Sequence, residues 1–140
     1  MEHALDRVYH SGDASLIIRG ESLDFDEISS RLDVEPAGIL RKVGKVSVGG
    51  RNVSKDFWMY RVKMRGDDPL GSLAELLGEL EPHHAYIRHL SDSGYDVCLR
   101  VSYRSELGQI YFEMPAELQA QIARFGVRLE FSILSWGGGV

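Results

Sequence analysis

The residue types that most often bind metals or act as acids, bases and nucleophiles are few in this chain. There are five histidines and one cysteine. His83 and His84 are adjacent and His89 follows, but no two histidines have the i, i+4 spacing of a zinc-binding helix. Cys98 would need a neighbouring base to act as a nucleophile, which His84 or His89 could supply. We expect exposed loop histidines and a packed or half-exposed cysteine, and therefore no metal, no cofactor and no catalytic residue.

Closely spaced carboxylates are a second candidate for acid–base chemistry. Asp24, Asp26 and Glu27 fall within four residues of each other. They also open a segment with helical periodicity, where Asp24 can cap the helix and Glu27 can reach back to the cap amide. Capping explains these acids without catalysis, so the sequence does not predict an enzyme.

The basic residues are concentrated in one segment. Residues 41–65 hold eight bases and one acid, in a chain whose formal net charge is -5. The acidic segments 21–40 and 66–82 flank this stretch, so we expect partial neutralisation on the folded surface. There is no phosphate-binding glycine motif between a strand and a helix. The candidate anion-binding set is therefore Arg41, Lys42, Lys45, Arg51, Lys55, Arg61, Lys63 and Arg65.

Hydrophobic periodicity indicates the elements that position these groups. Alternating or short apolar runs predict strands at 14–19, 57–65, 86–90, 95–103, 108–114 and 127–134, and a hairpin turning at Gly49-Gly50. In the strand at 57–65 the bases alternate with Trp58, Tyr60 and Val62. The strand is therefore expected to be half-buried, with its basic side chains directed away from the core.

Three helices are expected. The first begins at the Asp24 cap and ends before Pro36. The second begins at Gly71-Ser72 with a Ser-x-x-Glu capping box and stops at Pro82, and the third runs from Pro115 to Gly126. The element order is β-α-β-β-α-β followed by β-β-α-β, and its first part is ferredoxin-like.

The expected fold is therefore α+β, with a mostly antiparallel sheet and three helices on one face. We expect a single domain over residues 14–136, between a flexible N-terminus (1–13) and a glycine-rich tail (137–140). A lone cysteine, the absence of a secretory signal and the absence of an apolar run of roughly 20 residues favour a cytoplasmic protein that does not interact with membranes.

With these elements in place, the sequence resembles a bacterial domain-of-unknown-function family numbered 4279. The resemblance extends from about Ser15 to Trp136 and rests on SLIIRG, LDFDEISSRLDVEP, Gly44, Trp58, SLAELLGEL, VCLRVSY and GQIYFEMPAELQAQIARFGVRLEFSI. It implies a cytosolic bacterial protein and transfers no catalytic mechanism. The glycine-rich basic loop and the C-terminal glycines depart from the family pattern.

Two functions are expected from these observations. The first is a non-enzymatic protein-binding domain, such as an immunity protein that neutralises a toxin by electrostatic complementarity. Its contact surface would be the acidic patch of residues 67–81 or that of Asp24, Asp26, Glu27, Asp33 and Glu35. The alternative is an anion or RNA-binding module that uses the basic hairpin and strand face.

Overall fold

The architecture is built around one long central strand. The structure is a computed structural model, and it describes residues 9–42, 47–48, 51–52 and 54–137. β1 (His10–Gly20) contains the predicted apolar run and starts four residues earlier than expected. Ala14, Leu16 and Ile18 are buried on one side of the strand, and Ser15 and Ile17 are buried on the other.

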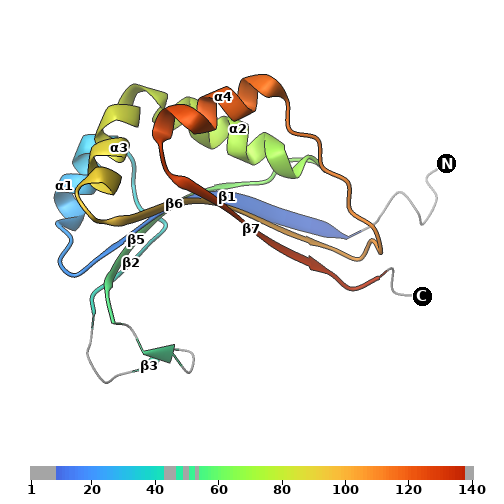
Figure 1. Cartoon of the computed structure of the whole chain (residues 1–140). Helices are drawn as coiled ribbons and strands as arrows, with labels where there is room; N and C mark the ends of the chain where they lie inside the picture. The colour runs from blue at the N-terminus through green and yellow to red at the C-terminus, as the bar shows by residue number, and fades with distance from the viewer. Residues whose placement is uncertain (1–8, 43–46, 49–50, 53, 138–140) are drawn as a thin grey trace.

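Four further strands complete a mixed sheet in the order β2-β5-β1-β6-β7 (Figure 1). They are β2 (Gly38–Leu40), β5 (Asp56–Lys63), β6 (Asp96–Ser105) and β7 (Arg128–Ser135). Neighbouring strands are antiparallel except β6 and β7, which are parallel. The fold is thus α+β as expected, but its sheet is not wholly antiparallel.

The helices all lie on one face of this sheet (Figure 1). They are α1 (Phe25–Leu32), α2 (Pro69–Leu80), α3 (His84–Asp92) and α4 (Ala116–Phe125), and the 3-10 helix η2 (Glu81–His83) connects α2 to α3. There are thus four α-helices in the described part of the chain, one more than expected. None of the described helices lies on the opposite face of the sheet, and we call that face the open face.

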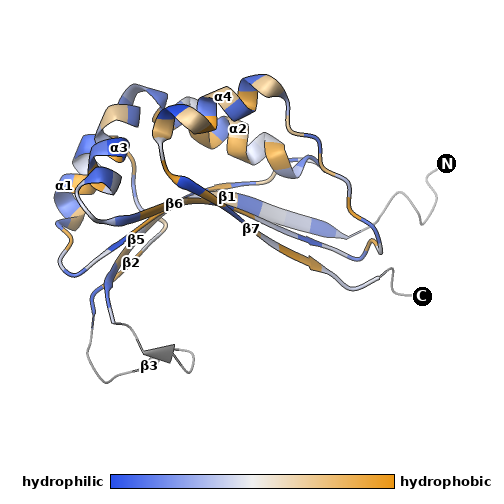
Figure 2. Cartoon of the chain, in the orientation of Figure 1, coloured by the Kyte–Doolittle hydropathy of each residue, from blue (hydrophilic) through white to orange (hydrophobic). Residues whose placement is uncertain are grey.

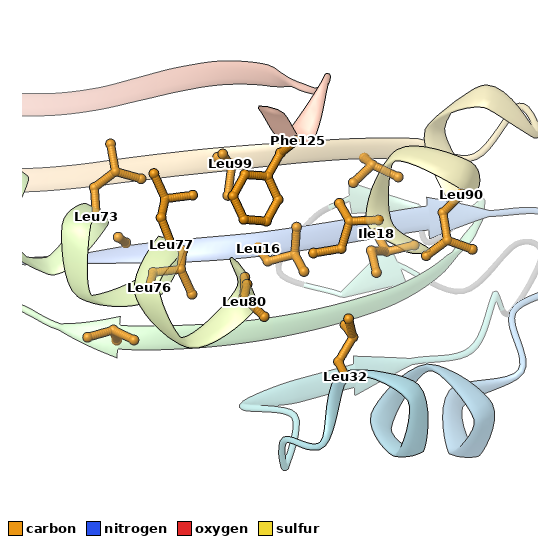
Figure 3. Packing of buried hydrophobic residues seen from close by; sticks show 14 of the residues in the cluster. Leu16, Ile18, Leu32, Leu73, Leu76, Leu77, Leu80, Leu90, Leu99 and Phe125 are labelled. Carbon is orange, nitrogen blue, oxygen red and sulfur yellow. The ribbon is translucent and has the colours of Figure 1, made fainter. Parts of the chain in front are cut away.

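The core lies between α2 and the centre of the sheet. Leucine side chains of α2 meet Leu16 and Ile18 of β1 and Leu99 of β6, and Phe125 of α4 closes the cluster (Figure 3). Each fully buried leucine of this kind contributes roughly 1.5–3 kcal/mol through removal of apolar surface from water. Hydrophobic and hydrophilic residues accordingly alternate along the helices (Figure 2).

The first helix forms as predicted. Asp24 is its N-cap, and its carboxylate accepts a hydrogen bond of 3.0 Å from the Glu27 amide. The helix ends when Asp33 adopts a left-handed conformation with a φ of 54°. Gly126, with a φ of 65°, ends α4 in the same way, as predicted.

The expected start of the second helix is wrong. α2 begins at Pro69, and its N-cap is Asp68, whose carboxylate accepts from the Leu70 amide at 3.1 Å. Ser72 is buried inside the first turn, where its hydroxyl donates to the Pro69 carbonyl oxygen. An Asp-Pro pair therefore provides both the cap and the preset first residue, in place of the capping box.

The expected strand at 86–90 is also wrong, because this segment is α3. Ile87 and Leu90 are three residues apart and buried on the same side of the helix. A short apolar run cannot be assigned to strand or helix from its periodicity alone, and packing against the core decides it here. Pro82 does not end the helical region, since η2 leads from α2 directly into α3.

The segment 108–114 forms no strand, which is the third correction. Because β6 and β7 are parallel, this segment belongs to the crossover that returns the chain through α4. Phe112 packs against Tyr103 and Phe131 at centroid distances of 5.7 and 6.3 Å, so the alternating pattern reflects burial without strand pairing. The order β-β-α-β expected after the first six elements is therefore replaced by β6-α4-β7.

β7 is the edge strand of the sheet, and this leaves its apolar side chains exposed. Phe131 and Ile133 share the helix-side face with Leu129, yet they are 44% and 46% exposed. A hydrophobic stretch is visible near the C-terminal end of β7 (Figure 2).

The basic loop contains a short hairpin that is not part of the main sheet. β3 (Ser47–Val48) and β4 (Arg51–Asn52) pair antiparallel as a separate two-stranded sheet, while the expected turn residues Gly49 and Gly50 lie outside the described residues. No helix in the described part of the chain is long and apolar enough to cross a membrane.

Candidate functional site

The first bases of the basic segment are engaged by carboxylates inside the fold. Asp56 is only 2% exposed and accepts hydrogen bonds from the Leu23 amide (3.0 Å), the Lys42 amide (2.8 Å) and Arg41 Nη1 (2.8 Å). The two amides and the guanidinium together hold the pKa of Asp56 below its usual value, against the effect of burial. Arg41 also stacks over Phe25 at 4.1 Å, so it is a structural residue.

Other members of the predicted cationic set are divided between paired and exposed positions. Lys42 pairs with Glu21 at 3.4 Å and Arg65 pairs with Glu75 at 3.0 Å. Lys55 is exposed. Lys45 lies outside the described residues, and Arg51 is described only in its backbone, as part of β4.

Arg61 and Lys63 are the two members that lie on the open face of the sheet within the described residues. Both are exposed residues of β5, and they line a hollow of about 480 Å³ on the open face together with Arg104 of β6. Ser11, Gly12, Asp13 and Ser102 complete the lining. Among the described residues, none of the three cations forms an ion pair.

The register explains why these cations meet. Lys63 lies opposite Asp13, and Arg61 lies opposite Ser15. Across β1 the same face continues with Ser102 opposite Asp13 and Arg104 opposite Ser11. Because side chains two residues apart share a face, β5 and β6 direct their bases to the same side of the sheet.

Asp13 is the one carboxylate in the hollow. It lies directly opposite Lys63, yet the two form no ion pair within 4.0 Å. Its charge offsets part of the positive charge, so the hollow has three cations against one anion. The described part of the site is therefore electropositive within an acidic protein.

Another part of the open face carries an ion-pair network that joins β1, β6 and β7. Glu130 accepts from Arg100 at 3.0 Å and from Arg128 at 3.0 Å. Asp96 pairs with Arg128 and, at 3.6 Å, with Arg19. These long side chains cover Ile17 and Cys98, which are buried although no helix packs on this face.

The network holds its carboxylates in the charged form. The hydrogen bond from Arg100 is the main cause that lowers the pKa of Glu130, and the hydrogen bond from Arg128 is the main cause that lowers the pKa of Asp96. The described strands carry six basic and three acidic side chains on the open face. The network pairs three of the bases with two of the acids at one end of this face, and Arg61, Lys63 and Arg104 lie outside it.

The predicted acidic patch lies on the helix side of the sheet. Its members are all in or next to α1, and among the described residues none of them forms an ion pair: Asp24, Asp26, Glu27, Asp33 and Glu35. A separate hollow of about 560 Å³ lies between the N-termini of α2 and α4. Four carboxylates line it, and these are Asp67, Asp68, Glu113 and Glu117.

His84 and His89, the two histidines considered as bases for Cys98, do not lie near it. Cys98 points to the open face, whereas His84 and His89 belong to α3 on the other side of the sheet. Burial raises the pKa of the Cys98 thiol. Within the described residues, no three His, Cys, Asp or Glu side chains are grouped so that they could hold a metal ion.

A family model described as a domain of unknown function, DUF4279, matches residues 7–136. The chain belongs to this family. No curated protein and no solved structure matches the chain.

Sequence reasoning on this DUF4279 domain missed Arg104 and the network of Arg19, Arg100 and Arg128. Their signal was present, because Arg100 and Arg104 alternate with the apolar residues of β6 just as Arg61 and Lys63 alternate with those of β5. The sequence alone did not reveal the order of the strands in the sheet, which places β5 and β6 on either side of β1.

Proposed function

We propose that this DUF4279 domain is a non-enzymatic binding domain whose open sheet face binds an anionic ligand at the hollow formed by Arg61, Lys63 and Arg104. The observation that supports this most directly is the convergence of three cations from two non-adjacent strands without an ion-paired carboxylate among the described residues. Oxyanions such as phosphate are bound in this way by arginine and lysine.

The charge balance of the chain strengthens the argument. In a protein with a net charge of -5, exposed acids are expected, and those at the start of α1 and α2 cap their helices. The exposed cluster of Arg61, Lys63 and Arg104, which forms no ion pair with another described residue, has no comparable structural explanation. The desolvation cost of binding there is low because the site is a shallow, open surface, so the ligand is recognised by charge and shape at the surface.

The architecture fits a binding role. We propose that β2, β5, β1 and β6, with α1 and α2, are ferredoxin-like, and their spatial order and mutual antiparallel directions support this. Such a layout leaves one face of the sheet free of helices and therefore available to a ligand. We also propose a cytoplasmic location, in line with the single cysteine.

Binding of inorganic polyphosphate tests the proposal. The wild-type protein should bind it at low salt, and the variant R61E/K63E/R104E should lose that binding. The matched control is R31E/R88E/R124E, which makes the same change in net charge on helices on the other side of the sheet. Equal binding by wild type and the open-face variant would contradict the proposal.

A second candidate function is supported by the carboxylate-lined hollow between α2 and α4. In this alternative the domain is an immunity protein, and Asp67, Asp68, Glu113 and Glu117 bind the basic surface of a nuclease-type toxin. The alternative acidic contact surface is α1. The test is co-purification with the product of an adjacent toxin gene, and its loss in D67N/E113Q/E117Q. Failure to bind or inhibit that toxin would exclude this function.

A further inference from the structure

Two exposed aromatic rings lie at one end of the open face. Tyr9 precedes β1 and Trp136 follows β7, and they are 50% and 46% exposed. Their ring centroids are 5.5 Å apart at an interplanar angle of 41°, so the two rings contact each other across the end of β6. Backbone hydrogen bonds from Glu106 to Tyr9 and from Trp136 to Ser105 fix both residues to that strand end.

The ring pair is continuous with the cationic hollow. The Tyr9 hydroxyl and the Ser11 hydroxyl are 3.1 Å apart, and Ser11 lines the hollow directly opposite Arg104. Leu134, which is exposed, lies opposite Arg104 on the other side. The Glu106 carboxylate, which lies at this end of the sheet, accepts a hydrogen bond from the Tyr9 amide at 2.9 Å.

The open face therefore has a regular layout along the strands. From its end inward come the ring pair, then Arg104 with Ser11, then Lys63 with Asp13 and Ser102, and then Arg61 with Ser15. Successive rows on one face are about 7 Å apart, so the rings and Arg61 are separated by roughly 20 Å along the sheet. This length accommodates several nucleotides of an extended strand.

We infer that the ligand of the open face is a single-stranded nucleic acid, whose base stacks on the Tyr9–Trp136 pair while its phosphates lie over Arg104, Lys63 and Arg61. This inference rests on the proposed anion-binding function and names its ligand class. Proteins bind single-stranded nucleic acids through aromatic rings that lie beside a row of arginine and lysine side chains. Each nucleobase can stack its π face on a ring, and each phosphate of the backbone can pair with a cation.

Other anions fit this arrangement less well. In a duplex the bases are already stacked on one another, so their faces are not available to the rings. The carboxylates of an acidic peptide could pair with Arg104, Lys63 and Arg61, but such a peptide has no planar ring in each residue that would stack on the Tyr9–Trp136 pair. Polyphosphate would occupy the cationic rows alone.

Tryptophan fluorescence gives a direct test, because the chain has two tryptophans and only one is accessible. Trp58 is 0% exposed and donates from Nε1 to Ser29, whereas Trp136 is exposed. Titration with oligothymidylate should quench the Trp136 signal, and titration with inorganic polyphosphate should not. The variants Y9A and W136A should each weaken oligothymidylate binding about tenfold and leave polyphosphate binding unchanged. W136F, which keeps a ring, should retain most of the affinity.

The outcomes separate this inference from the proposed function. Binding of both probes with equal affinity, unaffected by Y9A and W136A, would overturn the nucleic-acid inference and leave anion binding in place. Binding of neither probe would overturn both. Tighter binding to double-stranded DNA or to polyglutamate than to oligothymidylate would also overturn the inference. Circular dichroism of each variant checks that the fold is retained.

Discussion

Arg41 Nη1 and Asp56 Oδ2 are 2.8 Å apart, and the carboxylate side chain of this pair is 3% exposed whereas the guanidinium side chain is 59% exposed. The ion pair therefore joins the basic segment to the interior, at the point where β2 leads into the loop. One of the bases most suggestive of a ligand site in the sequence thus has a structural role.

Loss of this pair should strongly destabilise the protein. D56A removes the acceptor of two amides and a guanidinium, and we expect a loss of about 3 kcal/mol in the free energy of unfolding. E21Q, which removes the exposed Lys42–Glu21 pair, is the control and should change stability by less than about 0.5 kcal/mol. Urea denaturation of both variants measures the difference, and equal stabilities would contradict this role of Asp56.

The same carboxylate should make stability depend on pH in the acidic range. Because the pKa of Asp56 is lower in the folded state than in the unfolded chain, its contribution is present above the unfolded value near 4 and is lost as the pH falls through the folded value. The stability difference between wild type and D56A should therefore shrink on acidification. A difference that stays constant down to strongly acidic pH would contradict this.

Tyr60 should titrate at unusually high pH. Its hydroxyl donates to Glu79 at 2.5 Å, and this hydrogen bond, with burial, raises the pKa of Tyr60 to about 12. Because the folded pKa is raised, the stabilisation is complete below about pH 10 and is lost as the pH rises toward 12. Ultraviolet titration of tyrosinate should show a tyrosine that ionises near pH 12 and that is absent in Y60F. E79Q should move that group to lower pH.

Cys98 should be unreactive in the folded protein. It is 0% exposed, and burial raises the pKa of its thiol, so little thiolate is present at neutral pH. Ellman's reagent should label it only after denaturation. S132C, which places a thiol at an exposed position on the same face, should react at once and serves as the positive control. Rapid labelling of the native wild type would reopen a role for this thiol in catalysis.

The elements predicted correctly are those whose pattern is local. The Asp24 cap, the alternation of Trp58 and Val62 with Arg61 and Lys63, and the Gly126 terminus each follow from residues a few positions apart. The wrong predictions concern segments whose secondary structure is determined by tertiary contacts. The segment 86–90 is helical because Ile87 and Leu90 pack on the core, and 108–114 is unpaired because β7 joins β6 in parallel.

The candidate site was predictable only in part for the same reason. Arg61 and Lys63 were recognised from the alternation in β5, and their outward direction followed from the buried residues between them. Arg104, Tyr9 and Trp136 come from distant parts of the chain, and only the β1–β6 and β6–β7 registers bring them to the same end of the open face. The spacing of Tyr9, Arg104 and Trp136 along the sequence therefore does not predict that they lie close together.

The salt dependence of oligothymidylate binding tests the central claim most directly. If Arg61, Lys63 and Arg104 each neutralise one phosphate, the logarithm of the association constant should fall with the logarithm of the salt concentration with a slope of about -2. R104Q should reduce the magnitude of the slope by about 0.7, and R61E/K63E/R104E should abolish binding, whereas the helix-side control R31E/R88E/R124E should keep the wild-type slope. A wild-type protein that does not bind oligothymidylate at low salt, or an open-face variant with an unchanged slope, would contradict the assignment of this face as a surface that binds a single-stranded nucleic acid through these three cations.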